Sequence, residues 1–357
     1  MQLNTLSTIM VTNFDIEQQS QENIAVIDPY FSHDQINLPI LQQRAYNLRW
    51  ATVEDGVIPL TAADPDFPIA PEIRQAITNY VSTGVLSYGP AEGLPSLRHA
   101  IDAYFAQPRQ IPSHPDWILP TNSAAHAMFL TAQFALEKGE EAIIFDPVDF
   151  LFKKSVESAG GKAVYCPVSA ITGRFDPEVL AKLITDKTRL ICVCNPHNPL
   201  GKSLTKTELE CIADLAIKHN LWIMSDEIWS DIVYSDAQHI SIASLSEAVA
   251  QRTITIFGFS KSYGLAGLRV GCLLAPNATV FEQIINLSMV RTTAFGVSTL
   301  SQIAAQAALE HCDYWLLRFK AHLENMRNYA YQRLIRMPNV SCQKPDGTYV
   351  IFPNIRG

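Results

Sequence analysis

The sequence predicts an α/β protein built on a largely parallel sheet, and three short apolar runs are the main grounds for that prediction. Each run has the length of a buried strand and stops at polar residues. The runs and the residues that end them are 189–194 before Asn195, 221–225 before Asp226, and 253–259 before Ser260 and Lys261. The carboxyl ends of parallel strands meet at one edge of a sheet, where α/β proteins place their chemistry. We therefore expect an amide, a carboxylate and a lysine to converge there.

Helical and strand-like segments alternate around these runs. Apolar residues recur with helical spacing at 71–82, 94–107 and 123–137, and Ser123 suits the N-cap of the third segment. Strand and helix patterns then take turns over 142–145, 151–159, 162–167, 177–184, 189–194 and 206–219. Because parallel strands need crossover connections, this alternation is typical of a parallel α/β sheet.

The length of the chain predicts more than one domain. At 357 residues it exceeds one ordinary hydrophobic core. We expect an N-terminal arm with part of a small domain over 1–45, a large domain over 46–290, and the rest of the small domain over 291–357.

Composition narrows the partners and the compartment. With 27 basic and 35 acidic residues the net charge is −8, which disfavours nucleic acid or an anionic membrane as partner. The polar start of the chain is unlike a secretory signal, and no apolar run is long enough to span a bilayer. The seven cysteines show no C-x-x-C pattern, and we expect no metal site. A cytoplasmic protein with reduced thiols is expected.

Four side chains at the predicted sheet edge suit the chemistry of a pyridine aldehyde. The amine of Lys261 can form a Schiff base, and a buried Asp226 can keep a ring nitrogen protonated by raising its pKa. Asn195 can donate a hydrogen bond to a phenolate oxygen of the ring. Arg269, in the turn that follows the lysine, offers a planar fork for a phosphate dianion.

Three motifs, in this order and spacing, resemble those of the fold-type I pyridoxal-phosphate enzymes, the class I/II aminotransferases. They are N-P-H-N-P-L-G over 195–201, S-D-E-I over 225–228, and S-K-S-Y-G-L-A-G-L-R-V-G over 260–271. The resemblance runs from about residue 60 to the end of the chain. It implies a large domain with a mixed, mostly parallel sheet flanked by helices, a smaller α+β domain, and pyridoxal 5'-phosphate as cofactor.

The resemblance assigns further positions. Tyr88 matches a tyrosine that reaches the phosphate of the partner subunit, which implies a symmetric homodimer with shared active sites. Ser123 and Ala124 lie where the family places a phosphate cradle at the start of a helix. Asp64, in the segment A-A-D-P-D-F-P over 62–68, matches a loop on the substrate side of the site in the cystathionine β-lyase-like branch.

The chain departs from the family pattern at three positions near the cofactor. Asp149 stands where an aromatic ring usually stacks on the cofactor, so stacking must come from Phe150 or be absent. Trp229 replaces a tyrosine or histidine; its indole can donate a hydrogen bond but cannot titrate. Gly258 replaces a phosphate-binding serine, a loss for which Ser260 is expected to compensate.

The end of the sequence is a fourth departure. Residues 345–357 resemble a central strand of the small domain, after which family members usually continue to an arginine that binds the substrate carboxylate. We expect either that the chain is truncated or that Arg291 or Arg356 holds this carboxylate.

The resemblance leaves three functions open. The first is an aminotransferase, in which the freed Lys261 amine moves a proton and the amino group passes from an L-amino acid to a 2-oxo acid. The second is a cystathionine-type C-S β-lyase, which the segments 62–68 and 195–199 favour. The third is a non-catalytic pyridoxal-phosphate-binding regulatory protein, which the departures at Asp149, Trp229 and Gly258 leave open.

Overall fold

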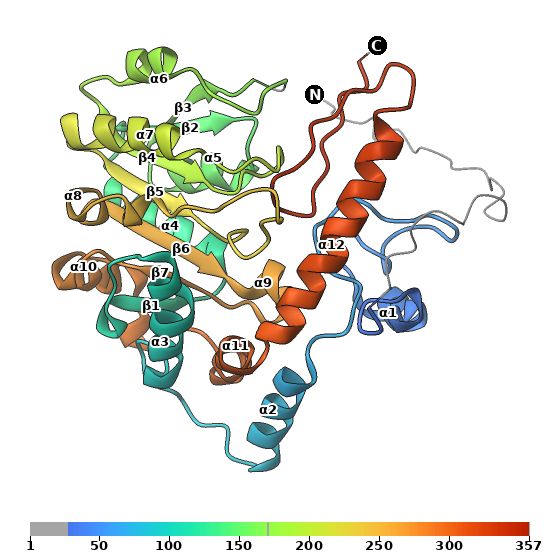
Figure 1. Ribbon diagram of the computed structural model, residues 1–357. Coiled ribbons are helices and arrows are strands. Elements are labelled where there is room, and N and C mark those ends of the chain that lie inside the picture. Colours follow the sequence, from blue (N-terminus) through green and yellow to red (C-terminus); the bar gives the residue numbers. More distant parts are fainter. Residues whose placement is uncertain (1–27, 170, 357) are drawn as a thin grey trace.

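A sheet of seven strands forms the centre of the computed structural model, which describes residues 28–169 and 171–356 (Figure 1). Its strands are β1 (Ile118–Thr121), β2 (Glu141–Asp146), β3 (Lys162–Pro167), β4 (Thr188–Cys194), β5 (Trp222–Asp226), β6 (Thr253–Gly258) and β7 (Gly271–Leu274). The spatial order is β1-β7-β6-β5-β4-β2-β3. Strand β7 is antiparallel to both of its neighbours, and every other neighbouring pair is parallel. The sheet is therefore mixed and mostly parallel, as the sequence predicts.

Helices cover both faces of this sheet because side chains alternate between the faces along each strand. On one face Ile144, Cys192 and Met224 pack with residues of α4 (Ala124–Ala135), α5 (Phe150–Ser158) and α10 (Ala278–Ser288). On the other, Ile143, Val193 and Ile223 pack with α6 (Pro177–Leu183), α7 (Lys206–Lys218) and α8 (Glu247–Ala250). This three-layer arrangement buries the strands and leaves their carboxyl ends for the site.

A third apolar cluster joins the sheet to the C-terminal helices. Phe257 and Phe259, at the end of β6, share it with Trp315 and Phe319. The helices that contribute are α2 (Pro71–Ser82), α3 (Pro95–Ile101), α11 (Thr299–His311) and α12 (Asp313–Leu334). In Figure 1 the long α12 runs beside the sheet-bearing part, between it and α1 (Leu38–Arg44).

The predicted elements match the structure closely where apolar periodicity is strong. Helix α2 and strand β3 have the predicted bounds, and α4 begins directly after Ser123, whose hydroxyl accepts a hydrogen bond from the backbone N–H of His126. The strand predicted over 345–357 is wrong. That segment makes only isolated bridges, Gly347 with Val233 and Asn354 with Ser341. The short strands β1 and β7, of four residues each, were not predicted.

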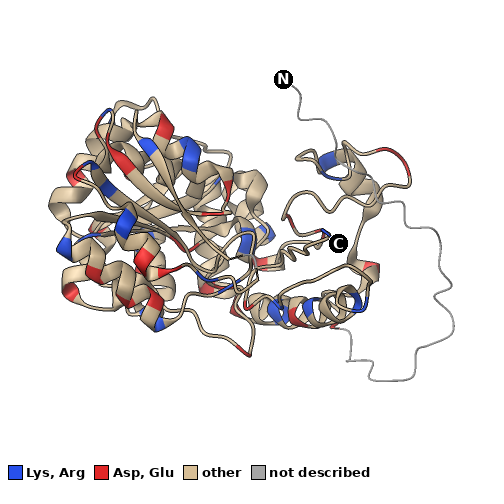
Figure 2. Cartoon of the chain, turned by 90° about the horizontal axis from the view of Figure 1, so that it is seen from above, with Lys and Arg blue, Asp and Glu red and all other residues tan. Residues whose placement is uncertain are grey.

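Basic and acidic residues are interspersed along the chain (Figure 2). Within residues 28–169 and 171–356 no helix has the length and apolar character needed to cross a membrane. The predicted arm over 1–45 lies partly outside the described residues, which begin at 28.

Candidate active site

The carboxyl ends of β4, β5 and β6 meet at one edge of the sheet, where Asn195, Asp226 and Lys261 follow their strands. The backbone N–H of Asn195 donates to the carbonyl of Asp226 at 3.0 Å, and that of Glu227 donates to the carbonyl of Ile256 at 2.8 Å. These bonds extend the parallel ladder to the last residue of each strand. The convergence predicted from the three apolar runs is therefore confirmed.

Lys261 lies in α9 (Phe259–Ser262), a single turn directly after β6. Its Nζ donates a hydrogen bond to the carbonyl oxygen of Ala63 at 2.6 Å and lies 5.4 Å from the ring centroid of Trp229. Burial lowers the pKa of Lys261, and the nearby carboxylates of Asp64, Asp149 and Asp226 act in the opposite direction. Among the described residues no carboxylate forms a direct ion pair with this amine, so it is available for reaction.

Asp226 is a buried carboxylate at the end of β5, with 7% of its surface exposed. Its Oδ1 accepts a hydrogen bond from the backbone N–H of Ile228 at 3.1 Å. Burial raises the pKa of Asp226 to about 7, and the negative charges of Asp149 and Glu227 add to this effect. A cation placed against this carboxylate would be strongly stabilised, which is what a protonated pyridine nitrogen requires.

A second buried carboxylate, Glu227, lies directly after Asp226, but its pKa is shifted in the opposite direction. Glu227 accepts hydrogen bonds from the hydroxyls of Ser225 and Ser241 at 2.9 and 2.6 Å, and from Nε2 of His239 at 2.9 Å. Burial raises its pKa, but His239 and these hydrogen bonds outweigh that effect and lower it. Glu227 therefore remains charged and anchors the segment behind Asp226.

The amide oxygen and nitrogen of Asn195 are both hydrogen-bonded within the chain. Its Nδ2 donates to the carbonyl of Ile240 at 3.0 Å, and its Oδ1 accepts from the backbone N–H of Leu204 at 3.0 Å. The side chain is 2% exposed and holds two loops together. Asn198, three residues later, instead directs its Nδ2 toward Asp149 at 3.2 Å. The motif contains Asn-Pro twice, so Asn198 is a second candidate for the cofactor contact predicted at Asn195.

The start of α4 and the turn after α9 form an anion-binding corner. Ser123 is its N-cap, and the guanidinium of Arg269 donates to the Ser123 hydroxyl at 3.1 Å. Both residues line a cavity of about 620 Å³. The first backbone N–H groups of a helix and its dipole favour an anion at this position. The structure therefore brings Ser123, Ala124 and Arg269 together as predicted.

The backbone of Ser123 has an unusual conformation. Its φ is 94°, in the region that favours glycine and costs other residues about 1–3 kcal/mol. The hydroxyl of Thr121 donates to the Ser123 carbonyl at 2.8 Å and holds this geometry. A glycine would relieve the strain but would remove the hydroxyl that Arg269 contacts.

Local packing accounts for two of the positions at which the chain departs from the family pattern. A Cβ on Gly258 would lie 3.1 Å from Cδ1 of Ile228 and 3.2 Å from Cβ of Ala124, so the close packing of β6 on α4 favours glycine over serine. Trp229 is 2% exposed and packs edge-on against the ring of Tyr349, with centroids 4.7 Å apart. Its donation to the cofactor stays a prediction.

The roles predicted for Phe150 and Ser260 stay predictions. Phe150 is the first residue of α5 and is 71% exposed, and no described contact holds its ring over the site. Ser260 is half-buried in α9 beside Lys261.

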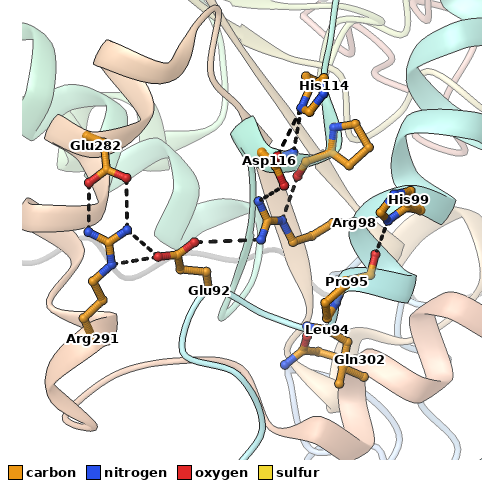
Figure 3. Close-up of polar contacts among 11 residues, drawn as sticks. Glu92, Leu94, Pro95, Arg98, His99, His114, Asp116, Glu282, Arg291 and Gln302 are labelled. Atoms are coloured by element: carbon orange, nitrogen blue, oxygen red, sulfur yellow. Dashed lines mark hydrogen bonds and ion pairs between the residues drawn. The ribbon is translucent and has the colours of Figure 1, made fainter.

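Arg291 is not free to bind a substrate carboxylate, contrary to the sequence-based expectation (Figure 3). Its Nε donates to Glu92 at 2.7 Å, and its Nη1 donates to Glu282 at 2.8 Å. These carboxylates raise the pKa of Arg291, which is further evidence that its charge is already matched. The alternative candidate, Arg356, is exposed. Asp64, in contrast, lies close enough for its charge to act on Lys261.

Tyr88 is 89% exposed and lines a second cavity of about 880 Å³. This cavity is formed by residues 86–91 together with 293–300 and shares Ala294, Phe295 and Gly296 with the cavity over Ser123 and Arg269. Phe295 is 60% exposed. The two hollows are therefore contiguous on the surface of this single chain.

Comparisons with known proteins agree with this site. The profile of the family "Aminotransferase class I and II" matches residues 55–357. The chain is 32% identical over 301 residues to an aspartate aminotransferase of Bacillus subtilis, covering 84% of this chain and 76% of that protein. The aromatic aminotransferase structure of Pyrococcus horikoshii superposes with a TM-score of 0.77 at 33% identity, covering 82% of this chain and 79% of that one. A pyridoxal-phosphate-bound putative aminotransferase of Clostridium difficile gives a TM-score of 0.78 at 25% identity, covering 90% and 81%.

The chain belongs to the class I and II aminotransferases. It is a pyridoxal-phosphate-dependent aminotransferase, an enzyme whose substrates are amino acids and 2-oxo acids. The residues present fit the cofactor: an anion corner at Ser123 and Arg269 for its phosphate, a buried carboxylate for its ring nitrogen, and an unpaired amine for its aldehyde. The relatives named here are aminotransferases, and they favour this reading over the lyase and non-catalytic alternatives.

Proposed function

We propose that Lys261 holds the cofactor aldehyde and later transfers the substrate's α-proton. The observation that supports this role is the buried amine itself, bonded to the Ala63 carbonyl and free of any ion pair among the described residues. Burial lowers the pKa of Lys261, which favours the neutral amine that can attack and accept a proton. The bound cofactor supplies an electron sink for the pair released when that proton leaves.

Asp226 and Asn198 orient the ring in this proposal. The Asp226 carboxylate pairs with the ring nitrogen and keeps it protonated, since a cation relieves the cost of burying this charge. Asn198 has a second N–H on its amide nitrogen besides the one directed at Asp149, and we assign it the donation to the phenolate oxygen. Asn195 keeps a structural role in the same loop.

The phosphate lies in the corner formed by Ser123, Ala124 and Arg269. Arg269 offers a charge-assisted hydrogen bond, and the start of α4 offers backbone donors and a favourable dipole. Ser260 is half-buried in α9, and we assign its hydroxyl to the same phosphate. Lys261 follows Ser260 directly, so the phosphate and the aldehyde are held by one short segment.

The active enzyme is a homodimer in this proposal. Tyr88 and Phe295 are exposed on contiguous cavities of one chain, an arrangement that a symmetric partner would cover. Under two-fold symmetry, Tyr88 of each subunit reaches the phosphate corner of the other. The seven free cysteines agree with a cytoplasmic location, which we include in the proposal.

The test of this function is an absorbance titration of the purified protein loaded with pyridoxal phosphate. We expect a visible band that disappears on adding an amino acid and returns on adding a 2-oxo acid, with the amino group recovered in the new amino acid. Lys261→Ala should abolish the band and turnover, whereas Lys162→Ala, at an exposed sheet-edge lysine, should change neither. Pyruvate released without an acceptor would indicate a lyase, and full turnover by Lys261→Ala would refute the assignment.

A further inference from the structure

Asp149 connects two loops at the carboxyl edge of the sheet. It follows β2 and is the N-cap of α5, where its Oδ1 accepts a hydrogen bond from the backbone N–H of Leu151 at 3.0 Å. Its Oδ2 accepts from Nδ2 of Asn198 at 3.2 Å, in the loop between β4 and α7. Because β2 and β4 are parallel neighbours, this bond ties together the two loops that leave them.

The bond also determines which way the Asn198 amide faces. An ionised carboxylate only accepts hydrogen bonds, so the amide must present its nitrogen and not its oxygen to Asp149. The backbone N–H of Asn198 is held separately by Sγ of Cys194 at 3.4 Å. With the backbone and one N–H both fixed, the second N–H of the amide has a defined direction.

The charge of Asp149 reaches the reacting groups. It acts on Lys261 and on Asp226, in both cases favouring the protonated form. The other charged groups that act on Lys261 are Asp64 and Asp226. Among the described residues Asp149 has no ion-pair partner, so its carboxylate is held by the two hydrogen bonds and by the more distant charge of Lys261.

We propose that Asp149 is a positioning residue that orients the Asn198 amide and stabilises positive charge at Lys261 when the cofactor is bound. This inference rests on the proposed function. Both carboxylate oxygens already accept hydrogen bonds, so the geometry favours this role over direct recognition of a cationic substrate.

The test uses the pH dependence of the visible band of the holoenzyme. Asp149→Asn keeps the size and the helix cap but removes both the charge and the acceptor for Asn198, and it should lower the pH midpoint of the band by about one unit. Asp149→Ser keeps a capping hydroxyl but loses the bond to Asn198, so it should also weaken cofactor binding. Asp149→Glu keeps the negative charge, so the pH midpoint of its band should lie close to that of the wild type.

A double-mutant cycle with Asn198→Ala tests whether Asp149 acts through Asn198. If it does, Asp149→Ser should weaken cofactor binding in the wild-type background but not in Asn198→Ala, so the effects are not additive. An unchanged midpoint in Asp149→Asn together with additive effects would overturn the inference and leave Asp149 as a helix cap only. Thermal melting of the cofactor-free variants identifies any variant that misfolds. If Asp149→Ser is unfolded, the result for Asp149→Asn decides the test. A wild-type protein without a visible band would instead refute the proposed function.

Discussion

Burial destabilises the charged form of the Asp226 carboxylate, and the cofactor-free protein does not offset this free-energy cost. The carboxylate is buried, accepts one backbone hydrogen bond, and lies near the like charges of Asp149 and Glu227, so its pKa rises to about 7. The folded chain therefore keeps a proton here over a range in which the unfolded chain, with a pKa near 3.8, has released it. Because the folded state binds more protons, stability falls as pH rises between these two values and then levels off.

Asp226→Asn should accordingly stabilise the cofactor-free protein while impairing the enzyme. The gain should grow from about pH 4 to pH 7 and reach up to about 4 kcal/mol, because the neutral amide removes the buried charge. Thermal or denaturant unfolding of both cofactor-free proteins at several pH values measures this. The holoenzyme should show weaker cofactor binding and slower turnover. A variant less stable than the wild type at pH 8 would contradict this account.

At the scale of elements, the anion corner depends on how closely α4 approaches β6 and β7. A Cβ on Gly271 would lie 2.5 Å from the backbone nitrogen of Ala124 and 2.7 Å from the carbonyl carbon of Ser123. Both neighbours are backbone atoms, so they cannot move without shifting the start of the helix. Glycine at this strand position therefore sets the place of the phosphate site.

Gly271→Ala should displace the start of α4 and weaken binding of pyridoxal phosphate. Overpacking of this kind also costs about 1–3 kcal/mol of folding stability. Gly267→Ala is the matched control, because a Cβ there meets nothing within 4 Å. Cofactor titration and melting of the two variants measure both effects. Equal cofactor affinity in the two variants would show that the helix start does not depend on this contact.

At the scale of the whole molecule, exposed apolar side chains gather beside the phosphate corner. Tyr88 and Phe295 line contiguous cavities and are 89% and 60% exposed. Exposed apolar surface of this kind marks an interaction site. In the proposed dimer it is covered by the second subunit, and each site is completed by Tyr88 of the other.

Phe295→Glu should shift the protein from dimer to monomer and lower cofactor affinity, because a charge would be buried at the subunit contact. Sedimentation or light scattering over a range of concentrations measures the assembly state. Ile171→Glu, at a site that is 85% exposed and outside both cavities, should leave it unchanged. A wild-type protein that remains monomeric at high concentration, with full activity, would refute the shared site.

The sequence by itself determined the α/β class and the convergence of Lys261 and Asp226. It also placed Ser123 and Arg269 in the site. The fold class and the convergence follow from local rules, because apolar runs predict buried strands and parallel strands bring their ends together. The phosphate role of Ser123 follows from the family resemblance. Orientation and pairing were decided only by the tertiary structure. The Asn195 amide, for example, is oriented by the carbonyl of Ile240, 45 residues away in sequence, and by the backbone N–H of Leu204.

Two further features were decided by contacts between distant segments. Arg291 pairs with Glu282, nine residues away, and also with Glu92, which lies 199 residues away in sequence and could not be identified from neighbouring residues. The strand expected over 345–357 did not form, because a strand needs a partner as well as a pattern and this segment finds only isolated bridges. Apolar pattern is a local property of the chain, whereas the partner of a side chain or strand is set by the packed whole.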